Sequence, residues 1–309
     1  MTDKSYLFFD IECANCFGGV GKMCSFGYVL ADSGFRILDE QDVVMNPEAE
    51  FDWYLFSPKN KCPLAYSKDY FRRQRTFEAY HREIKRLMEA PGRSVIGFSS
   101  ANDVGFLTSA CERYQLPAIQ FAAYDAAAII DSANGAHKSL ADWCGHYGVD
   151  TAGLRAHRSC DDAKMTMLLL KAFCGQSGAS LESVLERHKG SRLSVESYME
   201  RRAQKRHDDE LMKKITELYG KKCRARLSNA LDGGQYSFGF KLRSDNMEEA
   251  CALAALVYKH GGMLRKRLSH SGTIILEDGQ INSERTERMK AQGLSVISIS
   301  GLRELVRME

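Results

Sequence analysis

The pattern of apolar and polar positions over residues 1–176 predicts a sheet covered by helices on both faces. The apolar run Tyr6-Leu7-Phe8-Phe9 is typical of a central strand that is buried on both sides. Further strands are expected at residues 23–30, 36–45, 94–98 and 119–124. Helical spacing of apolar residues indicates helices at 76–88, 103–114, 139–147 and 162–173. Strands that form a meander and then alternate with helices predict a mixed α/β sheet.

The pattern changes after Gly175 to Gly178. Residues 181–206 and 208–226 are polar, basic and helical in spacing, and Asp232-Gly233-Gly234 then breaks the chain. A smaller α/β pattern runs from Tyr236 to the C-terminus. We therefore expect three parts: an α/β domain at 1–176, a basic helical linker at 177–231 and a small α/β domain at 232–309.

The composition agrees with more than one domain and excludes a membrane protein. A chain of 309 residues with 44% apolar and 27% charged residues is typical of a soluble protein with two domains. No apolar run approaches the roughly twenty residues of a membrane span. The N-terminus lacks the layout of a signal peptide, so we expect a cytoplasmic protein. Its ten cysteines are scattered, which favours reduced thiols.

The positive charge is concentrated in the predicted linker. Residues 189–226 carry twelve Lys or Arg against six Asp or Glu, although the whole chain has a net charge of only +3. A basic strip of this kind suits a nucleic-acid partner. It equally suits an exposed helix with many ion pairs, and the sequence leaves both interpretations open.

Two carboxylates lie at the C-terminal end of the first predicted strand. Asp10 and Glu12 are two residues apart, so on a strand they point to the same side. Two close anions repel each other, and burying them is costly unless a cation binds. A divalent metal site is one interpretation, and a solvated acidic turn is the other.

Three segments together resemble the DEDDh branch of the 3′-to-5′ exonucleases, which includes replicase proofreading subunits, RNase T and oligoribonucleases. The first motif, Asp-x-Glu, is present as Asp10 and Glu12. The second is the segment 97–107, in which Asp103 matches while the usual His-Asn pair and the Phe before Asp are absent. The third runs from His157 to Ala163. Asp161 and Asp162 compete for its acidic position, and the five-residue offset from the histidine selects Asp162. The resemblance covers about residues 4–174.

The resemblance implies an RNase H-like mixed sheet flanked by helices, and a site for two Mg²⁺ or Mn²⁺ ions. Asp10 would bridge the ions, and Glu12, Asp103 and Asp162 would complete their ligand shells. Hard divalent cations prefer such oxygen ligands. His157 would be the general base that takes a proton from the attacking water, since imidazole titrates near neutral pH.

The residues after the first acidic pair are implied to hold the 3′ end of the substrate. They are Cys13, Ala14 and Asn15 in this chain. Phe17 and Phe106 are candidates for stacking on a base, and packing in the core is the alternative for both. Basic residues of the next irregular segment are interleaved with aromatic ones, and they either border the substrate path or form a solvated face. These basic residues are Lys59, Lys61, Arg72, Arg73 and Arg75.

From Tyr236 onward the chain resembles a BRCT domain of the kind found in bacterial DNA ligases. A strand at 236–240, a helix at 247–259, the pair Gly261-Gly262 and a strand at 273–276 carry the resemblance. A helix at 283–291 and a final strand and helix follow. The usual Trp of the last helix is absent, and Gly239-Phe240 stands where many such domains have Ser or Thr followed by Gly. The resemblance implies binding to DNA ends or to a protein partner.

These inferences together predict a metal-dependent 3′-to-5′ exonuclease that releases nucleoside monophosphates from single-stranded ends. The BRCT-like module favours DNA as substrate, in repair or replication. RNA 3′-end trimming and the degradation of short oligonucleotides are the enzymatic alternatives. A non-catalytic adaptor that binds nucleic acid or protein is the alternative of another class.

Overall fold

The computed structural model describes residues 4–57, 59–60, 63–268 and 272–308. Lys61, one of the basic residues of the irregular segment, lies outside this set. The chain divides into two compact units, Met1–Glu200 and Arg201–Glu309, which we call unit 1 and unit 2 and describe separately.

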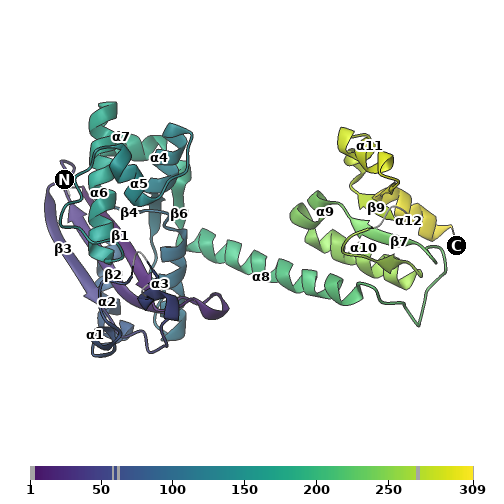
Figure 1. Ribbon diagram of the computed structural model, residues 1–309, viewed down its shortest axis with the longest axis horizontal. Helices are drawn as coiled ribbons and strands as arrows, with labels where there is room; N and C mark the ends of the chain where they lie inside the picture. The colour runs from purple at the N-terminus through teal and green to yellow at the C-terminus, as the bar shows by residue number, and fades with distance from the viewer. Residues whose placement is uncertain (1–3, 58, 61–62, 269–271, 309) are drawn as a thin grey trace. The chain divides into compact units, whose positions relative to one another are not determined.

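Unit 1 is built on a mixed sheet of six strands in the order β3-β2-β1-β4-β5-β6 (Figure 1). β1 pairs with β2 antiparallel and with β4 parallel, so it is a central strand. β2 and β3 are antiparallel, β4 and β5 parallel, and β5 and β6 antiparallel. The strands are β1 (Ser5–Cys13), β2 (Met23–Ala31), β3 (Ile37–Val44), β4 (Arg93–Gly97), β5 (Ala122–Asp125) and β6 (Arg192–Ser194). The mixed sheet and its first five strands confirm the sequence prediction, which did not include β6.

Helices cover both faces of this sheet. They are α1 (Lys68–Arg72), α2 (Phe77–Met88), α3 (Ala101–Arg113), α4 (Ala126–Asn134), α5 (Leu140–His146), α6 (Ser159–Ser177) and α7 (Leu181–Arg187). The 3-10 helices η1 (Phe17–Gly19) and η2 (Trp53–Phe56) precede α1, and η3 (Lys189–Ser191) follows α7. α8 (Val195–Leu218) begins in unit 1. The sequence did not predict α4.

The alternation of side chains along β1 explains where its carboxylates lie. Leu7 and Phe9 are fully buried in the cluster that contains residues of α2 and α3. Phe8, on the opposite face, is fully buried with residues of α4, α5, α6 and α7. Because side chains alternate along a strand, Asp10 and Glu12 continue the face of Phe8, where α6 packs.

A glycine of β2 lets the start of α6 come close to the sheet. A Cβ atom on Gly27 would lie 2.0 Å from the backbone nitrogen of Cys160 and 2.0 Å from the carbonyl carbon of Ser159. Only a residue without a side chain fits such an approach of two backbones. Gly27 pairs with Asp10 in the sheet, so this contact sets the distance between β1 and the first turn of α6.

Residues 177–231, predicted as a basic helical linker, contribute to both units. Leu181 and Val184 of α7 are buried in the core of unit 1, and Leu193 of β6 pairs with β5. Ile215 and Leu231 are buried in the core of unit 2. The two long helices expected here are instead α7 and α8, with η3 and β6 between them.

Unit 2 is a smaller α/β unit with a parallel sheet in the order β10-β9-β7-β8. Its strands are β7 (Gln235–Phe238), β8 (Met263–Leu264), β9 (Thr273–Leu276) and β10 (Ser295–Ser298). Its helices are α9 (Phe240–Asp245), α10 (Met247–Lys259), the 3-10 helix η4 (Asp278–Gln280), α11 (Glu284–Ala291) and α12 (Ile299–Arg307). Over the described part of the chain, we find no helix with the length and apolar character that crossing a bilayer requires.

Candidate active site

The two acids of the first motif lie at the free end of the central strand. The parallel pairing of β1 with β4 stops at Phe8, so Asp10 and Glu12 lie beyond it. On the other side, Asp10 pairs with Gly27 and Glu12 with Ser25, and the register shifts directly after Glu12. A bulge at this place re-aims the strand where it leaves the sheet. Both carboxylates thus project where the covered sheet opens.

Asp103 reaches the same region from the helix that follows β4. It lies in the first turn of α3 and is 6% exposed. The backbone N–H groups of Ile11 and of Asp103 itself act on its carboxylate. Ile11 stands between the two acids of β1, so this contact connects the second motif to the first.

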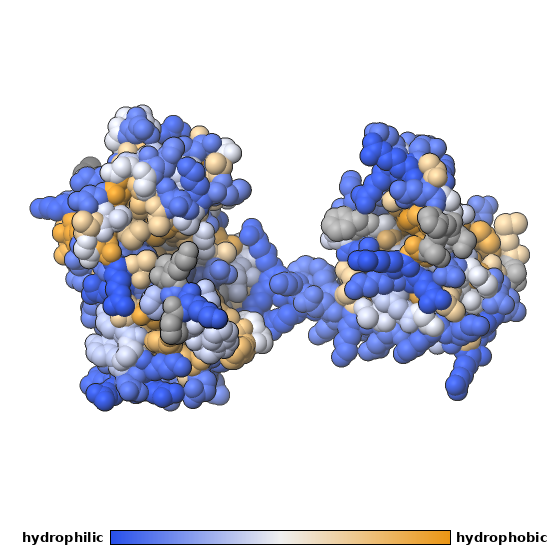
Figure 2. Space-filling model, in the orientation of Figure 1, coloured by the Kyte–Doolittle hydropathy of each residue, from blue (hydrophilic) through white to orange (hydrophobic). Residues whose placement is uncertain are grey.

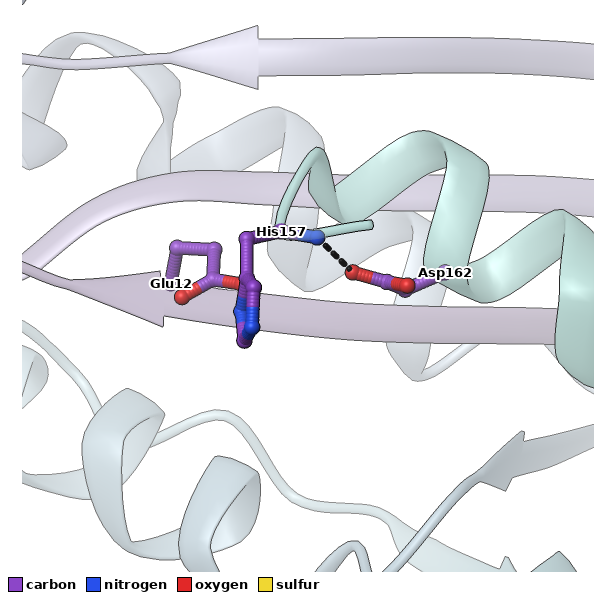
Figure 3. Close-up of side chains that lie close together, drawn as sticks. All are labelled: Glu12, His157 and Asp162. Carbon is purple, nitrogen blue, oxygen red and sulfur yellow. Dashed lines mark hydrogen bonds and ion pairs between the residues drawn. The ribbon is translucent and has the colours of Figure 1, made fainter. Parts of the chain in front are cut away.

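His157, Glu12 and Asp162 form a compact group (Figure 3). One ligand atom of each lies within 4.8 Å of the others. Nδ1 of His157 lies 3.1 Å from Oε1 of Glu12, and the backbone N–H of His157 donates to Oδ2 of Asp162 at 2.8 Å. His157 has a φ of 60°, which is uncommon outside glycine. The hydrogen bond to Asp162 accompanies this left-handed turn and fixes the histidine at the start of α6.

The pKa values of the acids report their crowding. Burial and then the charges of Asp103, Asp162 and Glu12 raise the pKa of Asp10 well above its usual range. Burial likewise raises the pKa of Asp103, with the charge of Glu12 adding to it. Burial and then Glu12 raise the pKa of Asp162 to about 7. The hydrogen bond to Glu12 raises the pKa of His157, so the imidazole holds its proton more firmly.

This donor set fits hard divalent cations. The charges that act most strongly on Asp10 are all negative, and they come from Asp103, Asp162, Glu12 and Asp42 in decreasing order. Carboxylate oxygens converging on one place are the ligands that Mg²⁺ and Mn²⁺ prefer. A cation bound there would relieve the repulsion that raises these pKa values. Over the described residues, Glu12, His157 and Asp162 are the group whose ligand atoms lie close enough together to hold a metal, and Asp10 and Asp103 add negative charge beside it.

The residues predicted to hold a substrate end lie in different surroundings. The side chain of Ala14 is fully buried in a small cluster with Phe51 and Phe71. Asn15 is 8% exposed, and its side-chain oxygen accepts from the backbone N–H of Phe17 at 3.3 Å. Cys13 is partly buried.

The two candidate stacking residues also differ. Phe17 is 70% exposed in η1, as a stacking role requires. Phe106 is partly buried in α3, where its ring lies against Gly21. The roles of the five residues toward a substrate stay predictions.

A feature that sequence reasoning missed is how the irregular segment 51–74 holds the site. The backbone N–H of Ala65 donates to the carbonyl of His157 at 3.2 Å. The Arg158 guanidinium donates to the Tyr66 hydroxyl at 3.1 Å and pairs with the buried Asp42 at 3.4 Å. The interleaved basic and aromatic residues were the only sequence signal. Tyr66 and Arg158 are more than 90 positions apart in the sequence, so no local pattern reveals their hydrogen bond.

Comparisons with known proteins were made for the whole chain. No family model and no curated protein matches the sequence. Among solved structures, it is similar to a 3′-exonuclease in complex with the histone mRNA stem-loop, with 16% identity, a TM-score of 0.49, and coverage of 58% of this chain and 85% of that one. The nuclease domain of a DEDDh family member bound to rAMP has 18% identity and a TM-score of 0.47, with 58% and 94% coverage. Escherichia coli exonuclease I with a dT13 oligonucleotide has 15% identity and a TM-score of 0.46, with 57% and 42% coverage. This chain covers less than half of the length of exonuclease I.

Proposed function

We propose that the protein is a metal-dependent 3′-to-5′ exonuclease of the DEDDh type that releases nucleoside monophosphates from single-stranded nucleic acid. One observation carries this proposal: Glu12, His157 and Asp162 form a compact group at the end of β1, and the charges of Asp103, Asp162 and Glu12 act on the buried Asp10. Clustered titratable groups with shifted pKa values are a mark of function rather than of stability. A fold that gained nothing from these charges would have no reason to bury them together.

In this proposal Asp10, Glu12, Asp103 and Asp162 hold two Mg²⁺ or Mn²⁺ ions. Such ions, when bound, act as Lewis acids toward the phosphate and lower the pKa of the attacking water. His157 is the general base. Its side chain is 46% exposed, its ring is held through Nδ1 by Glu12, and its backbone is fixed by Asp162. This leaves the imidazole at the rim of the acidic group, within reach of solvent.

A cleavage assay tests the proposal. Single-stranded DNA and RNA of one sequence, labelled at the 5′ end, are incubated with Mg²⁺ or Mn²⁺ and, separately, with a chelator. We expect a ladder that shortens by one nucleotide at a time with metal only, and none with Asp103→Asn. The matched control is Asp69→Asn, which changes an exposed acid of α1 and should cut normally. The polymer that is cut faster identifies the substrate class. No ladder on either polymer contradicts the proposal and favours the adaptor.

We further propose that residues 232–309 form a BRCT-like module that attaches the nuclease to DNA ends or to a protein partner, with the nuclease domain at 1–176 and residues 177–231 joining the two. Support comes from the strands and helices of unit 2, which follow the order that the resemblance implies. The pair Gly261-Gly262 ends α10 with Gly261 at a φ of 93°. This attachment would favour work on DNA in repair or replication. A pull-down assay with blunt and single-stranded DNA ends tests this attachment. It compares the full chain with variants of the full chain in which residues of α10 in unit 2 are changed.

A further inference from the structure

The strongest unassigned feature of unit 1 is an exposed tryptophan beside the acidic group. Trp53 is 73% exposed, the highest value among the large aromatic residues of the described chain. Its neighbour Tyr54 is 50% exposed, and the two rings meet edge to face at 6.0 Å. Figure 2 shows one face of unit 1, on which hydrophilic residues are interspersed with apolar ones. Trp and Tyr are enriched at binding interfaces, so two adjacent exposed rings of these types are a candidate binding feature.

The position of Trp53 is fixed rather than loose. Asp52 caps η2, its Oδ1 accepting from the backbone N–H of Tyr54 at 3.1 Å. The rest of the segment packs inward: Phe51 is 6% exposed, and its ring lies 5.3 Å from that of Phe56. Inward anchors and a side-chain cap hold the backbone from which the outward ring projects.

Hydrogen bonds connect this segment to the residues that directly follow β1. The backbone N–H of Asp52 donates to the carbonyl of Ala14 at 2.8 Å, and Ala14 is two residues after Glu12. The side chain of Asn15 donates to the carbonyl of Glu50 at 2.5 Å. The loop that carries Phe17 and the loop that carries Trp53 therefore lie side by side, next to the end of β1.

The charge of this region suits a polyanion. Residues 50–75 carry six Lys or Arg against three Asp or Glu, so the segment has the same net charge, +3, as the whole chain. The ammonium group of Lys68 lies 5.1 Å from the centre of the Phe56 ring. Aromatic rings among cations are the usual platform for single-stranded nucleic acids, because each base offers a flat face whatever its identity.

We propose that Trp53 stacks on a base of the bound single strand, with Phe17 as the second ring of the platform. The inference rests on the proposed function, which it deepens by naming a binding residue outside the acidic motifs. It predicts affinity for a single strand with little preference for sequence, since stacking reads no base edge. A duplex, whose bases are already stacked, would lose this contact.

The tryptophan content of the chain makes the test direct. The sequence has two Trp residues, and the second, Trp143, is 1% exposed and donates through its indole N–H to Asp131 at 2.8 Å. Quenching of Trp fluorescence by a bound strand therefore reports Trp53. The probes are dT12 and rU12, titrated into Asp103→Asn protein with Mg²⁺ so that the strand is not cut. We expect saturable quenching by the bound polymer.

Variants then test the energy of the contact. Adding Trp53→Ala should weaken the Kd of a dye-labelled strand about tenfold, and Trp53→Phe should restore most of the affinity. Because indole carries no charge, the dependence of log Kd on log salt should keep its slope. Leu38→Ala, which removes another exposed apolar side chain, in β3, is the matched control and should bind as the parent does.

The outcomes separate the two claims. A strand that binds without quenching, or a Trp53→Ala protein with the parent affinity, overturns the platform. Either result would leave the exonuclease intact if the wild-type protein still produces a ladder. Quenching together with the expected loss of affinity in Trp53→Ala supports the platform, even where no cleavage occurs and the proposed activity fails. A strand that does not bind at all overturns the platform.

Discussion

Gly27→Ala is expected to displace the start of α6 without changing any charged residue of the candidate site. The alanine Cβ would meet the backbone of α6 at 2.0 Å, at Ser159 and Cys160. Ordinary contact begins near 3.4 Å. One of the two backbones must therefore move by about 1.4 Å, because neither atom belongs to a flexible side chain.

The expected magnitude follows from this overlap. Overpacking in a core costs about 1–3 kcal/mol, and a contact between two backbones places this variant at the upper end, near about 3 kcal/mol. Asp162 and His157 move with the start of α6, while Asp10 and Glu12 stay on β1. A misplacement of about 1 Å lowers catalytic rates by about 10²-fold. The variant should thus lose both stability and activity.

Urea unfolding, monitored by Trp fluorescence, measures the change in the free energy of unfolding. Both Trp residues, Trp53 and Trp143, belong to unit 1, so the signal reports this unit. Gly175→Ala is the matched control, because it lies in α6 and a Cβ there meets nothing within 4 Å. It should stabilise by about 0.5–1 kcal/mol. Activity is compared at urea-free conditions where each protein is folded. A Gly27→Ala protein with the stability and rate of the wild type would refute the reasoning.

Three further predictions concern the site. In metal-free protein, Asp162→Asn should raise the free energy of unfolding at pH 8 by about 4 kcal/mol at most, because folding raises the pKa of this acid from 3.8 to about 7. The native carboxyl destabilises the fold as the pH rises from 3.8 to about 7. The urea midpoints of the wild type and Asp162→Asn should therefore coincide at pH 3.5 and differ at pH 8. The same difference between the midpoints at both pH values would contradict this. His157→Ala should lower the cleavage rate by roughly 10²–10⁴ while Mn²⁺ still binds; a parallel loss of Mn²⁺ affinity would make the histidine a ligand. A hydrogen bond from Cys13 lowers the pKa of the Cys16 thiol to about 7. Iodoacetamide should therefore alkylate Cys16 before Cys13 at pH 7, and the rate should rise with pH through this pKa. Mass mapping that finds Cys13 modified first would rule out this order.

Most strands and helices of unit 1 were predicted from the sequence because each is indicated by the pattern of apolar and polar residues within its own segment. The run Tyr6 to Phe9 is apolar on both faces, and it is buried on both. The alternation that places Asp10 and Glu12 on one side is a property of any strand. The order of three short motifs then predicted which distant segments belong to one site, and Glu12, His157 and Asp162 do lie together.

The parts that the sequence did not predict depend on long-range pairing. β6 is three residues long, and its partner β5 lies about seventy positions earlier, so nothing in its own pattern distinguishes it from a turn. The alanine-rich start of α4 lacks a clear polar face, which hides its period. The hydrogen bond from Asp52 to Ala14, which holds the segment of Trp53 against the end of β1, joins two loops without regular structure. Exposure of an indole ring is decided by such contacts and not by its neighbours in sequence.

Binding of Mn²⁺ to the metal-free protein tests the central claim most directly, since the claim is that the carboxylates at the end of β1 form a metal site. Free Mn²⁺ is measured by electron paramagnetic resonance during titration of the wild type, Asp10→Asn and the control Asp69→Asn. We expect two saturable Mn²⁺ ions for the wild type and the control, and loss of both from Asp10→Asn, because Asp10 would hold both. Equal Mn²⁺ binding by Asp10→Asn and the wild type would contradict the account.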